Sequence, residues 1–307
     1  MAIRTPLVEA PELTRRTGVP VHLKLENVQR TGAFKIRGAA NKLLSLPSEE
    51  RARGVIAVSS GNHGRAVAHV ARELGIRAVI CMSRGVPVHK ADVIRRLGAE
   101  VILEGASYDE AERQAGRMKE DLGLTMIHPF DDPSVIAGQG TIGLELLEDL
   151  PEVDTVVVPL SGGGLLSGIA VALKSADPGA RVIGVSMERA PVMFHSLEAG
   201  QPVELAEQET LASALVGGIG LENRFTFDVI RTTVDEILLV SEQEIADAMV
   251  FALKDHKLVV EGGGAVALAA VLHGRIRPIG KNVAVVISGG NVDIPLLMEI
   301  ATTRRDG

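Results

Sequence analysis

Short apolar runs alternate with helical patterns along almost the whole chain, and this alternation is the strongest constraint on its fold. In the first half the predicted strands are Val55–Val58, Ala78–Met82 and Val101–Leu103, and the predicted helices are His63–Leu74, Lys90–Leu97 and Tyr108–Leu122. Strands that alternate with helices of this length form parallel sheets, because each helix returns the chain to the same end of the sheet. The sequence therefore predicts an α/β fold.

A second series of the same kind begins near Pro133. Its predicted strands are Thr155–Val158, Val182–Val185 and Val283–Ile287, and its predicted helices are Ile136–Leu147, Leu165–Leu173 and Glu242–Lys254. No low-complexity linker and no short repeat separates the two series. We therefore expect two open parallel sheets in two closely joined domains.

Charge and composition argue against several classes of partner and site. A net charge of −7 gives no broad cationic field for nucleic acid. Cys81 is the single cysteine, so neither an internal disulfide nor a multi-cysteine metal site is available within one chain. No apolar stretch approaches the roughly 20 residues that cross a bilayer, and the N-terminus has no signal-peptide pattern. We expect a cytoplasmic protein without nucleic-acid or membrane partners.

Three polar segments with glycines follow predicted strands, namely Ser59–Gly64, Ser161–Gly164 and Ser288–Asn291. Ligands of open α/β sheets bind at the carboxyl ends of strands, where loops meet the positive ends of helices. In the second segment, consecutive glycines let backbone N–H groups turn toward a phosphate. This segment predicts an anion-binding loop, and the three segments together predict one shared pocket.

The same glycine loop can be interpreted as part of a dinucleotide-binding fingerprint. A predicted strand follows it, and Glu188 stands where a ribose-binding acid is expected. The pattern fits poorly, because Ser167 occupies the position of the third glycine. A nicotinamide-dependent oxidoreductase is therefore a remote alternative.

Lys35 stands at the start of a predicted helix, among small and apolar neighbours. A single lysine in such a position is more often a solvated helix residue. Beside a phosphate-binding loop it gains a second interpretation, because an enzyme that uses pyridoxal 5'-phosphate (PLP) needs one lysine amine for a Schiff base and for proton transfer. A PLP-binding or amino-acid-binding protein without catalysis would need the same pocket.

Eight segments of the chain occur in the order found in the fold-type II PLP-dependent enzymes, in the branch of threonine dehydratases, serine dehydratases and serine racemases. They are Arg4–Leu7, Lys24–Asn27, Gly32–Ala39, Ser59–Gly64, His128–Asp132, Ala137–Thr141, Ser161–Gly164 and Ser288–Asn291. The chain resembles this family over nearly its whole length. The resemblance implies the tryptophan synthase beta-like fold, with PLP in the cleft between a large domain, residues 1–44 and 133–307, and a small mobile domain, residues 54–131.

The resemblance also implies how PLP is bound. Lys35 forms the Schiff base, Phe34 packs beside the ring, and Asn62 hydrogen-bonds the 3′ oxygen. The phosphate is bound by Ser161, Gly162, Gly163, Gly164 and Leu165. Ser288 offers its hydroxyl to the pyridine nitrogen, and Glu261 lies near the cofactor.

For the substrate, the resemblance implies a turn that binds the carboxylate through Ser59, Ser60, Gly61, Asn62 and His63. Lys35 is the expected catalytic base. Ser60 is a second catalytic candidate, because it occupies the position that serves racemases as an acid/base on the opposite face of the ring. Ser186 and Val192 stand where some relatives have acidic metal ligands, so we expect no metal at that place, although Glu188 could supply one ligand.

The activity implied is β-elimination, in which a small hydroxy amino acid such as L-threonine or L-serine gives a 2-oxo acid and ammonia. The turn Ser59–His63 lacks the threonines typical of cysteine synthases, which favours elimination over β-replacement. A serine- or aspartate-type racemase is one alternative. Another is a dehydratase of 3-hydroxyaspartate or of a hydroxyectoine pathway, which the segment Ser186–Arg189 resembles. We expect a homodimer or homotetramer, and no isoleucine-binding regulatory domain after Asp293.

Overall fold

The computed structural model of the protein describes residues 1–106 and 108–303. It divides into two compact units. Residues Met1–Ile3 and Lys35–Gly138 form the smaller unit, and residues Arg4–Phe34 and Gln139–Gly307 form the larger unit. The chain therefore passes from one unit to the other between Phe34 and Lys35.

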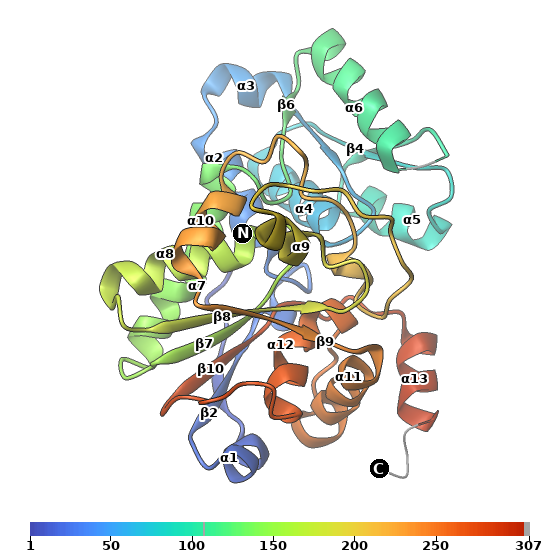
Figure 1. Cartoon of the computed structure of the whole chain (residues 1–307). Helices are drawn as coiled ribbons and strands as arrows, with labels where there is room; N and C mark the ends of the chain where they lie inside the picture. The colour runs from blue at the N-terminus through green and yellow to red at the C-terminus, as the bar shows by residue number, and fades with distance from the viewer. Residues whose placement is uncertain (107, 304–307) are drawn as a thin grey trace. The chain divides into compact units, whose positions relative to one another are not determined.

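The smaller unit contains a parallel sheet with the strand order β5-β4-β3-β6 (Figure 1). Its elements are α2 (Lys35–Ser45), α3 (Ser48–Arg53), β3 (Val55–Val58), α4 (Asn62–Leu74), β4 (Ala78–Met82), α5 (Val88–Arg96), β5 (Glu100–Leu103), α6 (Tyr108–Leu122) and β6 (Thr125–Met126). Alternate residues of β3 point to opposite faces. Val55 and Ala57 pack in a core with α2, α4 and α5, whereas Ile56 and Val58 pack against α6.

The larger unit contains a sheet with the strand order β1-β2-β10-β7-β8-β9, in which the strands are parallel except for the edge strand β1 (Figure 1). Its elements are β1 (Leu7–Glu9), α1 (Pro11–Thr17), β2 (Val21–Leu25), β7 (Thr155–Pro159), α8 (Gly164–Ala176), β8 (Arg181–Met187), α9 (Val192–Ala199), α10 (Thr226–Thr233), β9 (Glu236–Val240), α11 (Glu242–His256), α12 (Gly262–Leu272), β10 (Val283–Ile287) and α13 (Ile294–Thr303), with 3-10 turns η1 (Glu26–Val28) and η2 (Ser213–Leu215). Helix α7 (Pro133–Asp149) begins in the smaller unit and ends in the larger one.

Both faces of the larger sheet are covered by helices, which is the arrangement that near-continuous apolar strands require. In β7, Val157 packs in the core that contains α1, α11 and α12, whereas Val156 and Val158 pack in the core that contains α8, α9 and α10. Strand β10 alternates in the same way, with Val285 on the first side and Val286 on the second. The prediction of an α/β fold with parallel sheets is confirmed.

The elements predicted from the sequence are present, with ends that differ by at most three residues. Strands β4 and β10 and helix α6 have the predicted bounds. The division differs from the expected one at three places, because residues 1–3, 35–44 and 133–138 lie in the smaller unit rather than the larger. For residues 35–44 the reason is packing, since Ile36, Ala39 and Leu43 of α2 belong to the same core as α4.

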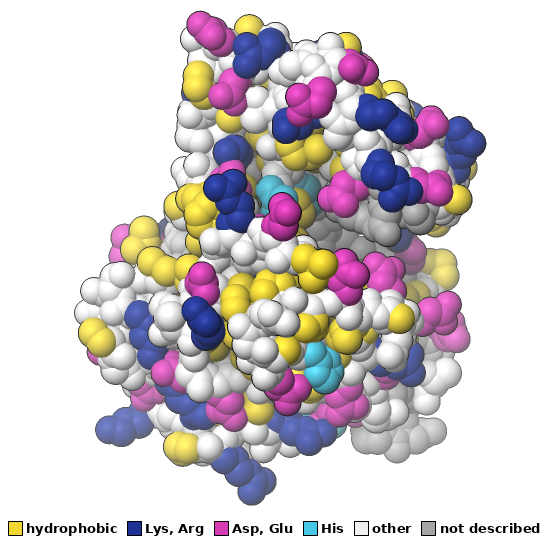
Figure 2. Space-filling view, turned by 45° about the horizontal axis from the view of Figure 1, so that its top comes forward, with side chains coloured by type: hydrophobic (Ala, Val, Ile, Leu, Met, Phe, Trp, Pro, Cys, Tyr) yellow, Lys and Arg dark blue, Asp and Glu magenta, His cyan; other side chains and the backbone are white. Residues whose placement is uncertain are grey.

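Among the described residues, no helix combines the length and the apolar character that crossing a membrane requires. Lys and Arg side chains are interspersed with Asp and Glu on the face shown in Figure 2. This face therefore presents both signs of charge rather than one large cationic area.

Candidate active site

Lys35 is the first residue of α2, and its ammonium group is held by a backbone carbonyl. Its Nζ donates a hydrogen bond of 2.6 Å to the carbonyl oxygen of Pro129. The side chain is partly buried, and burial lowers its pKa to about 8. Burial has this effect because a low-dielectric environment disfavours the charged form. A substantial fraction of this amine is therefore neutral near physiological pH.

His63 lies in the first turn of α4 and is buried. Its Nε2 is 2.8 Å from the carbonyl oxygen of Ile127. A carbonyl only accepts hydrogen bonds, so Nε2 carries the proton and Nδ1 is unprotonated. Burial, together with the charge of Lys35, lowers the pKa of His63 to about 3. His63 is thus neutral, and the only N–H group of its ring already donates to the Ile127 carbonyl.

The turn after β6 contains a second histidine that faces Lys35. His128 Nδ1 accepts the backbone N–H groups of Phe130, at 3.3 Å, and of Asp131, at 2.7 Å. Burial and the charge of Lys35 lower the pKa of His128, while Asp131 and Asp132 oppose this effect. No role was predicted for this segment from the sequence, because the two-residue strand β6 before it had not been predicted.

The turn Ser59–Gly61 joins β3 to α4 in the smaller unit. The Gly61 N–H donates to Ser59 Oγ at 3.2 Å, and the Arg65 N–H donates to the Gly61 carbonyl at 3.1 Å. The N–H groups of residues 62–64 therefore have no acceptor within the helix and give this end a positive potential. Gly64 is required here, because a Cβ would lie 2.4 Å from the Ser59 carbonyl oxygen.

The glycine loop of the larger unit joins β7 to α8. Gly163 has φ of +92° and precedes the first residue of α8, and Ser161 Oγ donates to the Leu215 carbonyl at 2.9 Å. A Cβ at Gly163 would lie 2.6 Å from Ile230 Cδ1. The loop leaves the first N–H groups of α8 without helical acceptors, which is the arrangement that binds phosphate in other proteins.

Ser288 follows β10 directly and is buried. Because β10 and β7 are adjacent parallel strands, Ser288 and Ser161 follow the same edge of the sheet. The Ser288 carbonyl accepts the Phe34 N–H at 3.0 Å, and the ring of Phe34 packs against the core beside α8. The structure thus places Phe34, Ser288 and the glycine loop in one part of the larger unit.

Glu261 precedes α12, and its carboxylate lies against the turn that follows Ser288. Its N–H donates to the Gly289 carbonyl at 3.1 Å, and a Cβ at Gly289 would lie 2.0 Å from Glu261 Oε1. A Cβ at Gly264 would lie 2.3 Å from the Gly289 oxygen. The turn at Gly289 and the first turn of α12 therefore pack backbone against backbone, which explains the glycines in both.

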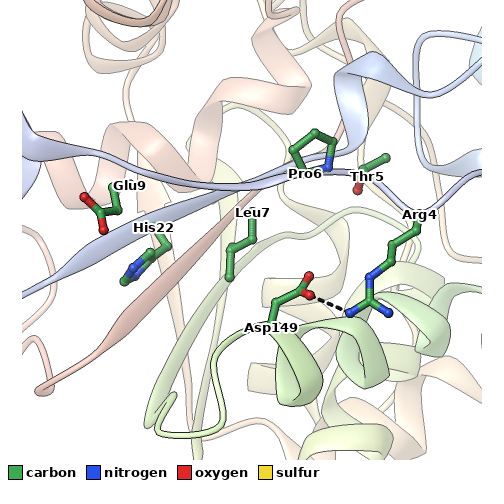
Figure 3. A pocket seen from close by; sticks show the side chains of 7 residues that line it. All are labelled: Arg4, Thr5, Pro6, Leu7, Glu9, His22 and Asp149. Atoms are coloured by element: carbon green, nitrogen blue, oxygen red, sulfur yellow. Dashed lines mark hydrogen bonds and ion pairs between the residues drawn. The ribbon is translucent and has the colours of Figure 1, made fainter.

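An open depression of about 540 Å³ lies elsewhere in the larger unit and is lined by Arg4, Thr5, Pro6, Leu7, Glu9, His22 and Asp149 (Figure 3). Glu9 and His22 are paired across β1 and β2, and Asp149 of α7 binds Arg4. These residues lie along the face of the edge strands beside α7. The depression is thus separate from the loops that follow β7 and β10.

Comparison with known proteins shows which family has this arrangement. Residues 2–289 match the family described as pyridoxal-phosphate dependent enzyme. This chain belongs to that family. It is similar to an L-threonine ammonia-lyase of Thermotoga maritima, with 49% identity over 97% of this chain and 73% of the relative. As the family does, the chain uses PLP.

Solved structures of the family agree with the fold. The processed form of threonine deaminase isoform 2 from Solanum lycopersicum has a TM-score of 0.92 and 36% identity, covering 99% of this chain and 84% of that one. Maize serine racemase has a TM-score of 0.91 and 36% identity, covering 98% of this chain and 92% of that one. The resemblance found in the sequence is thereby confirmed, and the nicotinamide alternative is dropped.

The described residues fit PLP chemically. The glycine loop and the start of α8 offer backbone donors to a phosphate, and no side chain of Gly162, Gly163 or Gly164 covers them. The Lys35 amine, with its lowered pKa, suits attack on an aldehyde. The roles of the individual residues belong to the proposal below.

Proposed function

We propose that this protein removes water from a small β-hydroxy amino acid such as L-threonine or L-serine and releases a 2-oxo acid and ammonia. The observation that carries the proposal is the Lys35 amine, which contacts a neutral carbonyl and has a pKa lowered to about 8. One group that serves both as nucleophile and as base needs such a pKa near working pH. The relatives named threonine ammonia-lyase support this choice of reaction.

Residues of the larger unit hold the cofactor in this proposal. The N–H groups of the loop Ser161–Leu165 bind the phosphate, and the Ser288 hydroxyl pairs with the pyridine nitrogen. Phe34 packs beside the ring, and Glu261 stabilises the turn around Ser288. When bound, PLP supplies an electrophilic carbon for an amine and a ring that accepts electron density from the substrate α-carbon.

Residues of the smaller unit act on the substrate. Asn62 donates to the 3′ oxygen of the cofactor, and the turn Ser59–His63 binds the substrate carboxylate at the positive end of α4. Its donors are the backbone N–H groups at the start of α4 and the serine hydroxyls, since the Gly61 N–H is bonded to Ser59 Oγ. The imidazole of His63 adds no donor, because its N–H group is bonded to Ile127.

Lys35 removes the α-proton, and the β-hydroxyl then takes up a proton and leaves as water as the Cβ–O bond breaks. Ser288 is a neutral partner and leaves the pyridine nitrogen largely unprotonated, so negative charge at the α-carbon is stabilised only moderately. Moderate stabilisation favours prompt loss of the β-substituent over slower competing reactions. The enamine that is released hydrolyses in water to the 2-oxo acid and ammonia.

The test is a substrate screen with the PLP-loaded enzyme. Loading should give an absorbance band at about 410–420 nm. L-Serine, L-threonine and 3-hydroxyaspartate are then supplied separately, and 2-oxo acid and ammonia are measured in equal amounts. A clear preference identifies the substrate. A protein that shows the band but forms no 2-oxo acid from any of them is a PLP-binding protein without this activity, and the proposal fails.

Racemisation is a second candidate activity, favoured by the similarity to maize serine racemase and by Ser60 in the turn before α4. In this alternative Ser60 exchanges a proton with the α-carbon on the face opposite Lys35. Ser60→Ala should then abolish D-serine formation from L-serine while elimination persists. Equal loss of both activities would assign Ser60 to carboxylate binding alone.

Two further expectations accompany the proposed function. The single, buried Cys81 suits a cytoplasmic location. We also propose that the enzyme is a homodimer or a homotetramer, and light scattering coupled to size-exclusion chromatography measures this directly.

A further inference from the structure

The segment Ile127–Asp131 is held at three points by side chains around Lys35. His63 Nε2 donates to the Ile127 carbonyl at 2.8 Å, and Lys35 Nζ donates to the Pro129 carbonyl at 2.6 Å. His128 closes the segment from its other side by accepting two backbone N–H groups. The carbonyl that holds the amine therefore belongs to a turn shaped by a histidine side chain.

The bonds of His128 fix its protonation state. Backbone N–H groups only donate, so Nδ1 is the unprotonated nitrogen and Nε2 carries the proton. The ring lies edge-on to Phe130, with ring centroids 4.6 Å apart. Protonation of Nδ1 would remove the acceptor for Phe130 and Asp131 and open the turn.

We propose that His128 is a positioning residue for Lys35, because its Nδ1 folds the turn that presents the Pro129 carbonyl to the amine. The proposal rests on the proposed function only in taking Lys35 as the residue that captures PLP. His128 itself needs no contact with substrate or cofactor.

Four titratable side chains lie in or beside this part of the smaller unit, namely His63, His128, Asp131 and Asp132. His63 and His128 are neutral, Asp131 is the last residue of the segment, and Asp132 follows it. Asp132 is engaged by Lys42 Nζ at 2.6 Å and caps α7 through the Ser134 N–H at 2.8 Å. A carbonyl acceptor adds no negative charge, so it fixes the amine in a buried place and still lets it lose its proton.

Two substitutions separate this role from simple packing. In His128→Asn, the amide Oδ1 takes the place of the imidazole Nδ1, so the two N–H groups keep an acceptor. In His128→Gln, the amide lies at the position of Nε2 and the acceptor at Nδ1 is lost. The turn should therefore persist in the Asn variant and open in the Gln variant.

The first measurement uses the full chain from which PLP has been removed. Acetylation of Lys35 is followed by peptide mass spectrometry across pH to give the pKa of its amine, and PLP capture is followed at about 410–420 nm. With the turn open, the amine moves toward water, so its pKa should rise by about one unit and capture at pH 7.5 should slow about tenfold in His128→Gln. His128→Asn should capture PLP within about twofold of the wild type. Equal behaviour of the two variants, whether intact or impaired, overturns the proposal.

A second measurement needs no variant. Nitrogen NMR of histidine-labelled wild-type protein reports which ring nitrogen of His128 carries the proton. The expected tautomer has an unprotonated Nδ1 and a protonated Nε2 near neutral pH, and the opposite tautomer overturns the proposal even if His128→Gln fails to fold. Failure of the proposed function is distinct, because it appears as PLP capture without 2-oxo acid formation in the wild type.

Discussion

The backbone N–H of Phe34 donates a hydrogen bond of 3.0 Å to the carbonyl of Ser288. This bond and the neighbouring bridge between Ala33 and Gly289 join the segment before Lys35 to the end of β10. The cofactor lysine proposed here therefore starts its helix from a residue fixed to the strand end that carries the proposed pyridine partner. Phe34 and Ser288, which lie far apart in sequence, are thus held in a defined register.

The first prediction concerns the side chain at position 288. Ser288→Asp replaces a neutral hydroxyl by a carboxylate, which favours a protonated pyridine nitrogen and stabilises charge at the α-carbon more strongly. We expect 2-oxo acid formation to fall about tenfold or more, which corresponds to about 1.4 kcal/mol in the barrier. The share of slower side reactions should rise. Ser288→Ala is the matched control, and an unchanged partition in the Asp variant would contradict the electronic role.

The second prediction concerns Lys35 itself. Lys35→Ala removes both the amine that captures PLP and the base, so the absorbance band should be lost and turnover should fall by about 10²–10⁴-fold or more. Far-ultraviolet circular dichroism should be unchanged, because Lys35 begins α2 and contributes little to its buried face. Lys119→Ala, an exposed lysine of α6, should retain full activity. Normal turnover in Lys35→Ala would exclude the mechanism.

The strands with continuous apolar sequence could be predicted accurately, because burial on both faces leaves little choice of structure. Val283–Ile287 is an example, with every residue buried. Strand β2 was not predicted, because His22 and Lys24 interrupt its apolar pattern. Lys24 is nevertheless fully buried, and its partners Glu145 and Asp149 lie more than 100 residues away. Only the tertiary structure brings these charges together.

The site could be predicted only in part, because some of its contacts also depend on the tertiary structure. Glycine loops and strand ends are local features, and Ser161–Gly164 and Ser288 lie where the sequence analysis expected them. The contacts of Lys35 are not local. The roles of His63 toward Ile127 and of His128 toward Asp131 depend on protons and backbone carbonyls that a sequence pattern does not specify.

The third prediction concerns the glycine loop. Gly163→Ala should lower the free energy of unfolding by about 2–4 kcal/mol, because φ of +92° disfavours a side chain and the Cβ would clash with Ile230. PLP should also dissociate faster. Gly18→Ala is the control, since Gly18 has φ of +76° with nothing within 4 Å, so only the backbone cost of about 1–2 kcal/mol applies. Equal losses of unfolding free energy in the two variants, measured by urea unfolding, would show that the space around Gly163 can accept a Cβ.

The fourth prediction concerns the buried ion pair of Lys24. Its Nζ lies 2.7 Å from Glu145 Oε2 and donates to the Thr5 carbonyl at 2.7 Å. Lys24→Met keeps the length of the side chain but leaves Glu145 without its buried cation, so unfolding should become easier by about 3–5 kcal/mol. Arg4 is an exposed partner of Glu148 and Asp149 at the end of α7, so Arg4→Met should have little effect on the free energy of unfolding. Similar unfolding midpoints for the two variants would show that the Lys24 pair contributes no more than a surface pair.

The last prediction concerns the dependence of stability on pH through His63. Its pKa is lowered to about 3 in the folded protein, against about 6.5 for an unfolded chain. Between these values the unfolded state binds one more proton, so stability rises with pH and is lost as the pH falls below about 6.5, by at most about 1.4 kcal/mol per pH unit. His63→Gln places an amide N–H where the Nε2–H lies, so the bond to Ile127 can persist without a group that titrates. Urea unfolding of PLP-free protein at pH 8, 7.2, 6 and 5 should give parallel stabilities above pH 6.5 and a steeper loss for the wild type below it. A constant difference between the two proteins over the whole range would mean that the pKa of His63 is the same in the folded and the unfolded states.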